Sequence, residues 1–179
     1  MIEANGPGAV TLGVGDRASA IAAVKAALRI ASDDEDDLIA AFAETALGLA
    51  EGFTGQVLIA RTIGETIDAG GWEAIGAMPV RAVTGVVNAD GIALPVGDYA
   101  VDIDADGTGW VRSSGRITVT FEAGACDDWG ALPAPIRQGV TMLAAHLFDD
   151  RDGAKPVPAA VTALWRPFRA VRLTKPVRT

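Results

Sequence analysis

Histidine and cysteine, two side chains that often carry catalysis, are scarce in this chain of 179 residues. It has one histidine, His146, and one cysteine, Cys126, which excludes a disulfide within the chain. His146 lies beside the apolar stripe of a predicted helix, a position typical of a helix flank, and no serine has the flanking glycines of a nucleophile elbow. A Walker A loop, an HExxH helix and a Cys-x-x-Cys pair are also absent from the sequence. We therefore expect no catalytic residue, no cofactor-binding residue and no metal ligand.

Two weaker patterns could bind a ligand, and both have a simpler interpretation. Gly13–Ala18 matches the GxGxxA turn that holds the phosphates of a dinucleotide, but a second helical pattern follows where a parallel strand is needed. We therefore expect a flexible lead-in over residues 1–15. Asp102–Gly107 resembles the start of a calcium loop, yet Ser113 occupies the position of the bidentate acid and the flanks alternate like strands. This pattern predicts a hairpin with solvent-facing acids.

Charge is unevenly distributed along the chain. The net charge is −8, and residues 1–90 carry all of it, with 5 basic and 13 acidic side chains. Residues 156–179 contain five basic side chains and no acid. The overall sign argues against a general nucleic-acid binder, because neutralising phosphates requires a basic surface. The basic end could still bind an acidic partner.

Five consecutive acids form what we call the acidic cluster: Asp33, Asp34, Glu35, Asp36 and Asp37. Acids at the start of a helix interact favourably with the positive end of the helix dipole. Because adjacent residues point around a helix instead of converging, a solvated helix start is favoured over a cation site.

The spacing of apolar residues predicts the elements that would position these groups. Helices are expected from an N-cap at Asp16 to about residue 30, over about 34–52, over about 133–147 and over about 158–165. The second helix shows an apolar stripe of Leu38, Phe42, Ala46, Leu49 and Phe53. Between the second and third helices, period-two alternation predicts about five antiparallel strands.

This order predicts an α+β fold with a helical core of about four helices, an inserted antiparallel β section and an extended C-terminal arm. We expect a flexible leader at 1–15, one domain at 16–155 with its β section at about 56–124, and a short helix plus basic arm at 156–179.

The segment after residue 164 mixes large aromatics with arginines. Trp165 and Phe168 alternate with Arg166 and Arg169, and Trp and Arg are enriched among the residues that dominate binding energies at interfaces. Two interpretations are open: the arm binds a partner, or Trp165 and Phe168 pack on the chain's own body.

The motifs together are similar to a known family. The chain resembles the head–tail connector proteins of long-tailed phages, also called adaptor or head-completion proteins, and the related adaptor of alphaproteobacterial gene transfer agents. The matching opening is K-x-x-L-R-I, an acidic patch with D-D-x-L, and E-x-x-T-G-[RQ]. These motifs lie at Val24–Ile30, Asp33–Ile39, Ala46, Glu51, Thr54-Gly55 and Leu58–Thr62, and further matches lie at Met78–Val83, 133–147 and 161–169.

The resemblance implies a structural protein and not an enzyme. Such adaptors form a homo-oligomeric ring, typically of twelve copies, between the portal protein and the next tail component, a stopper or tail terminator. DNA passes through the channel without sequence-specific binding, and no membrane is involved. The protein would be made in the cytoplasm of the host bacterium and lie at the head–tail junction of a phage or gene transfer agent particle.

The resemblance also implies roles for two groups of residues. The acidic cluster would face a ring neighbour or the DNA channel. The arm would dock on the portal through Trp165, Arg166, Phe168, Arg169, Arg172, Lys175 and Arg178. The alternative from another class is a small α+β enzyme or ligand-binding protein without recognisable motifs.

Overall fold

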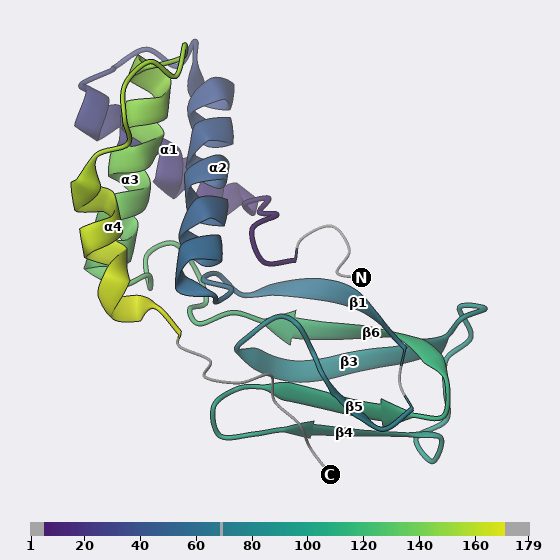
Figure 1. The fold of residues 1–179 in the computed structure, drawn as a ribbon. Helices are drawn as coiled ribbons and strands as arrows, with labels where there is room; N and C mark the ends of the chain where they lie inside the picture. Colours follow the sequence, from purple (N-terminus) through teal and green to yellow (C-terminus); the bar gives the residue numbers. More distant parts are fainter. Residues whose placement is uncertain (1–5, 69, 171–179) are drawn as a thin grey trace.

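A computed structural model describes residues 6–68 and 70–170 of the chain. Its helices form a bundle that stands on one end of the β section (Figure 1). They are α1 (Val14–Leu28), α2 (Asp36–Thr54), α3 (Ala134–Asp149) and α4 (Ala159–Trp165), followed by a 3₁₀ turn, η1 (Arg166–Phe168). The α+β class and the four-helix core predicted from the sequence are confirmed.

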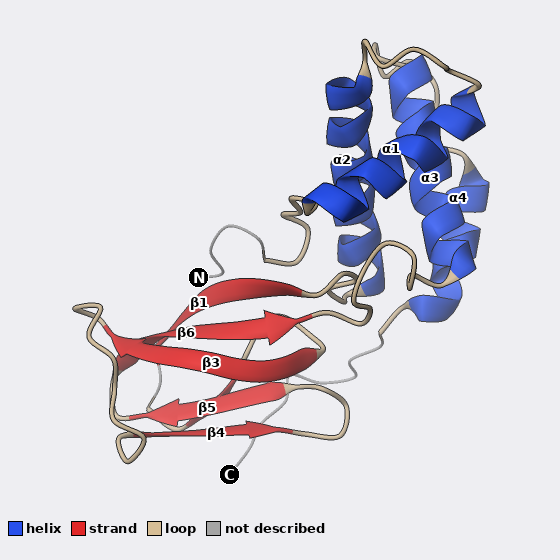
Figure 2. Cartoon of the chain, turned by 180° about the vertical axis from the view of Figure 1, so that it is seen from behind, coloured by secondary structure: helices blue, strands red, loops and turns tan. Residues whose placement is uncertain are grey.

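The inserted β section consists of two small antiparallel sheets (Figure 2). One sheet has the order β1 (Arg61–Asp68), β6 (Arg116–Ala123), β3 (Val80–Asn88). The other has the order β2 (Trp72–Ala74), β5 (Gly109–Ser113), β4 (Tyr99–Ile103). The described residues thus form six strands where about five were expected. Because β1 pairs with β6 along its whole length, the section enters and leaves the helical bundle at the same place.

Each part of the chain has its own apolar core. In β6 every second side chain is buried, including Ile117, Val119 and Phe121, which matches the period-two pattern of the sequence. The helical core is built largely from alanine, valine and leucine, with Trp129 and Trp165 supplying bulk. Because the helices and the sheets have separate cores, interactions outside these cores must fix the joint between the two parts.

Two details of the first helices differ from the sequence prediction. Gly13, not Asp16, is the N-cap of α1, and Asp16 instead accepts a 2.7 Å hydrogen bond from the backbone N–H of Trp129. In α2 the fully buried side chains include Ile39 and Leu47, whereas Leu49 of the predicted stripe is 53% exposed. The predicted stripe therefore marks one flank of the buried surface and not its centre.

Residues 6–13, expected as a flexible lead-in, have specific contacts with α2. The side chain of Leu12 is buried, and its backbone N–H donates to Glu44 Oε1 at 3.0 Å. Gly8 packs so closely on Gly48 that a Cβ added at Gly48 would lie 2.5 Å from the Gly8 carbonyl oxygen. A close approach of two backbones explains why α2 has glycine at this position.

Candidate functional site

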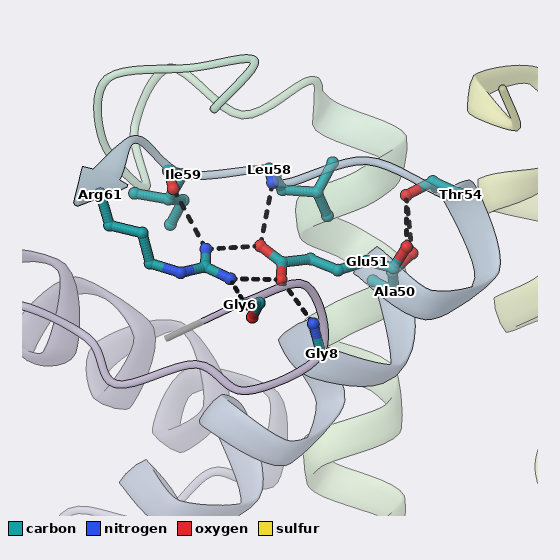
Figure 3. A network of polar contacts seen from close by, with 8 residues as sticks. All are labelled: Gly6, Gly8, Ala50, Glu51, Thr54, Leu58, Ile59 and Arg61. Carbon is teal, nitrogen blue, oxygen red and sulfur yellow. Dashed lines mark hydrogen bonds and ion pairs between the residues drawn. The ribbon is translucent and has the colours of Figure 1, made fainter. Parts of the chain in front are cut away.

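The joint between the helices and the sheets is a buried ion pair (Figure 3). The carboxylate of Glu51, on α2, is fully buried and lies 2.7 Å from both terminal nitrogens of the Arg61 guanidinium, at the start of β1. It also accepts hydrogen bonds from the backbone N–H groups of Gly8 at 3.0 Å and Leu58 at 2.9 Å. Arg61 completes the network by donating to the carbonyl oxygen of Gly6. One side chain of α2 thus joins the N-terminal segment, the helix and the first strand.

The residues after Glu51 end α2 and hold the C-terminal segment. The Thr54 hydroxyl donates a hydrogen bond to the carbonyl oxygen of Ala50. Gly55 ends the helix with a φ of 72°, a left-handed conformation that favours glycine. The Thr54 carbonyl accepts a 2.7 Å bond from the N–H of Ala170, and the Gln56 amide donates to the Phe168 carbonyl at 2.9 Å. These contacts give the E-x-x-T-G-Q motif a physical role: both ends of the described chain are attached at this joint.

The structure corrects the expectation that Trp165 contacts a partner. Its side chain is only 3% exposed, packs against Gly139 of α3 and lies 5.9 Å, centroid to centroid, from the ring of Phe53. The indole N–H donates a 3.3 Å hydrogen bond to the carbonyl oxygen of Ile136. Trp165 therefore belongs to the helical core, the alternative that the sequence left open.

The other described residues of the predicted arm remain accessible to different degrees. Arg166 and Arg169 are exposed, and Phe168 is half-buried at the edge of the helical core. The Arg169 guanidinium lies 5.9 Å from the centroid of the Phe53 ring, within the range of a cation–π interaction. Arg172, Lys175 and Arg178 lie outside the described residues.

The acidic cluster is largely paired inside the chain. Lys25, on α1, donates to Asp33 and at 2.8 Å to Asp36. Arg17 contacts Asp37 at 2.8 Å, and Arg151 contacts Glu35 at 2.6 Å. The hydrogen bond with Lys25 lowers the pKa of Asp33.

Asp34 keeps only a local hydrogen bond with the Ser32 hydroxyl among the contacts found for the described residues. The cluster therefore presents less negative charge to its surroundings than five adjacent acids suggest.

The remaining candidate residues do not converge. His146 is half-buried on α3, and Cys126 lies in the loop after β6, where burial raises the pKa of its thiol. Asp104 of the predicted hairpin turns inward to accept the backbone N–H groups of Asp106 and Thr108, as in a turn-forming aspartate. Within residues 6–68 and 70–170, no three His, Cys, Asp or Glu side chains are grouped as a metal site would require.

Sequence reasoning did not recognise the Glu51–Arg61 pair as the joint. The available signal was a glutamate four residues after Leu47, on the buried side of an otherwise apolar helix. Such a residue must find a partner, since an unpaired buried carboxylate is strongly disfavoured. None of the helices in the described part of the chain is both long and apolar enough to cross a membrane.

Comparisons with known proteins give matches among solved structures only. No protein-family model and no curated protein matches the chain. A chain in the neck of an empty gene transfer agent (GTA) particle, computed with C6 symmetry, is 27% identical with a TM-score of 0.74, over 98% of this chain and 100% of that one.

Two further structures give similar values. A chain in the neck of a native GTA particle, computed with C12 symmetry, is 28% identical with a TM-score of 0.69, over 98% of this chain and 100% of that one. A chain in the virion of a native GTA particle is 26% identical with a TM-score of 0.70, over 97% of both chains. The alternative of a small enzyme gains no support from these matches. The predicted resemblance is confirmed: over nearly its whole length, this chain has the fold of a neck component of gene transfer agent particles.

Proposed function

We propose that this chain is the head–tail adaptor of a gene transfer agent or tailed-phage particle. It is a structural component that forms a ring between the portal and the next tail component, around the channel through which DNA passes. The observation that carries the proposal is the match to neck chains over 98% of this chain, because it includes both the helical bundle and the inserted sheets. A likeness confined to four helices would be far less specific.

The ring is supported by the symmetry of the related structures, which were computed with C6 and C12 symmetry. We propose twelve copies, the larger of these symmetries. The protein would be made in the bacterial cytoplasm and carried in the particle. Its role would require no cofactor and no catalysis.

The portal-binding arm starts at the joint. Arg166, Phe168 and Arg169 form its described base, and Arg172, Lys175 and Arg178 continue it. Two hydrogen bonds, from Gln56 to the Phe168 carbonyl and from the Ala170 N–H to the Thr54 carbonyl, attach this base to the body. A basic segment that starts from an attached base is complementary in charge to an acidic groove on a partner.

The acidic cluster would face a ring neighbour or the channel. Its residual negative charge would repel the DNA backbone weakly, so that DNA passes without binding. Lys25, Arg17 and Arg151 already compensate three of its five charges. The remaining negative charge lies on Asp34 and on the pair of Asp33 and Asp36, which share Lys25.

Deletion of the gene in the cell that makes the particle tests the proposal. We expect filled heads and separate tails in negative-stain electron micrographs, together with loss of DNA transfer. Supplying the intact chain from a plasmid should restore whole particles. Normal particles without the chain would refute a role at the head–tail junction.

A further inference from the structure

Two exposed helix surfaces of the bundle lack the charge that solvent-facing helices usually carry. The first, which we call the α2 face, consists of Ala41, Thr45, Leu49 and Gly52, all exposed. The only charged residues of α2 after Asp37 are Glu44 and Glu51, and both are engaged within the chain. Leu49, at 53% exposure, is a large apolar side chain without a cover in the described structure.

The second surface, which we call the α4 face, is formed by Val157, Ala160 and Ala163, all exposed. Val157 is 52% exposed, close to the value for Leu49. Two cations flank this surface, Lys155 before α4 and Arg166 after it, and residues 155–167 contain no acid. Both faces therefore combine small residues, which allow close helix packing, with one large apolar side chain.

The two faces lie on different sides of the bundle, and their charges are complementary at one end. Helix α3 lies between α2 and α4, and the chain runs in the same direction along α2 and α4 (Figure 1). The start of the α2 face carries the exposed acids Asp34 and Asp37, and the start of the α4 face carries Lys155. Two copies placed side by side with parallel helices would bring opposite charges together.

We propose that the α2 face of one copy packs against the α4 face of the next copy, and that this contact builds the ring. The inference rests on the proposed function and names the two surfaces that the ring would use. Two different patches on each subunit make a head-to-tail contact, which closes into a ring when the rotation between neighbours divides a full turn. Leu49 would pack beside Ala160 and Ala163, and Asp34 and Asp37 would lie near Lys155.

Cross-linking of assembled particles tests this arrangement. The chain's lone cysteine, Cys126, is replaced by serine, and Leu49→Cys and Ala160→Cys are introduced together. A short bis-maleimide applied to purified particles should link these chains into a ladder of oligomers. Each single-cysteine chain should give no ladder, since the contact joins two different faces. A control chain with Ala22→Cys, on the exposed side of α1, and Ala160→Cys should also give none.

Three results would overturn the assignment. A ladder from the control pair but not from the Leu49 and Ala160 pair would place the contact elsewhere. Cross-linked dimers of the chain with Leu49→Cys alone would indicate two identical faces in contact. If the intact chain is absent from purified particles, the proposed function itself fails and the ring contact falls with it. In the first two cases, the chain's presence in particles leaves the proposed function standing.

Charged substitutions provide a second, independent readout. Leu49→Glu and Ala160→Glu each place a carboxylate in an uncharged contact, and we expect at least a tenfold loss of particles with tails. Both sites are exposed in the single chain, so the melting temperature of the purified chain should stay unchanged. Ala22→Glu is the matched control and should support normal assembly. Normal assembly of both test variants would contradict the proposal.

Discussion

Replacing Arg61 with methionine would test whether the buried ion pair fixes the joint. Methionine retains much of the length of the side chain but removes both of the 2.7 Å contacts to Glu51. The Glu51 carboxylate, fully buried, would then keep only the N–H groups of Gly8 and Leu58 as partners. Removing one partner of a buried ion pair costs about 3–5 kcal/mol.

That loss is large for a single domain, whose free energy of unfolding is about 5–15 kcal/mol. For a chain of this length it corresponds to a fall of roughly 6–20 °C in melting temperature. The assay is urea denaturation followed by circular dichroism and tryptophan fluorescence, with coincidence of the two curves as the check on two-state unfolding. Thermal melts give the second estimate.

A double-mutant cycle separates the pair from its surroundings. Glu51→Gln alone leaves the buried guanidinium facing an amide, so its cost should be similar to that of Arg61→Met. The double variant removes both charges. Gly8 and Leu58 donate to different oxygens of Glu51, so the single glutamine oxygen can still accept one of these two N–H groups. We therefore expect the double variant to lose about 3 kcal/mol less than the sum of the two single losses.

Arg116→Met is the matched control for the same chemical change. Arg116 contacts Asp68 at 3.5 Å across β1 and β6, but both side chains are more than half exposed. Exposed ion pairs contribute about 0–1 kcal/mol, so this variant should be nearly as stable as the original chain. A loss below about 1 kcal/mol for Arg61→Met, or strictly additive single variants, would refute a stabilising role of the pair.

Three further outcomes follow from the contacts of other residues. In Gly139→Ala the new Cβ would lie 2.2 Å from the Trp165 indole nitrogen, so we expect the free energy of unfolding to fall by about 1–3 kcal/mol. In Gly52→Ala the new Cβ would meet open space, so the free energy of unfolding should instead rise by about 0.5–1 kcal/mol. Urea denaturation of both variants checks these values. Burial raises the pKa of Glu65, so its contribution to stability is present below the unfolded-state pKa and is lost as the pH rises through the folded-state pKa. Glu65→Gln, which can still accept the Gly76 N–H, should therefore raise the melting temperature at about pH 7, and thermal melts should show this gain vanishing below about pH 4. Removal of residues 171–179 should leave the fold intact, because Phe168 and Ala170 keep their hydrogen bonds to Gln56 and Thr54. The same truncation should abolish co-sedimentation with the portal. Retained co-sedimentation would mean that the arm is not the docking element.

The sequence predicted the elements better than their connections. Apolar spacing located α3, which begins after Pro133 and buries Ile136, Val140 and Leu143 on one stripe. Alternation located β6 in the same way. The pairing of β1 with β6 was beyond such reasoning, because partners 48 to 62 residues apart leave no periodic signal.

The candidate site was only partly predictable for a related reason. The sequence marked Trp165 as a binding residue because it stands among arginines, yet Gly139 on a distant helix provides the space that buries it. Similarly, the acidic cluster looked highly charged because Lys25, Arg17 and Arg151 are separated from it in sequence. Local composition predicts what a segment could bind, whereas the fold determines which residues of its own chain the segment contacts.

The central claim, that this chain is the adaptor ring of a particle neck, is tested most directly by a cryo-electron microscopy reconstruction of the neck. Particles would be purified from cells that make the chain, and the neck reconstructed without imposed symmetry. We predict a ring of identical subunits at the head–tail junction whose density fits the four helices and the two inserted sheets of this chain. Density of this fold at another site on the particle, or a neck built from a different fold, would contradict the account.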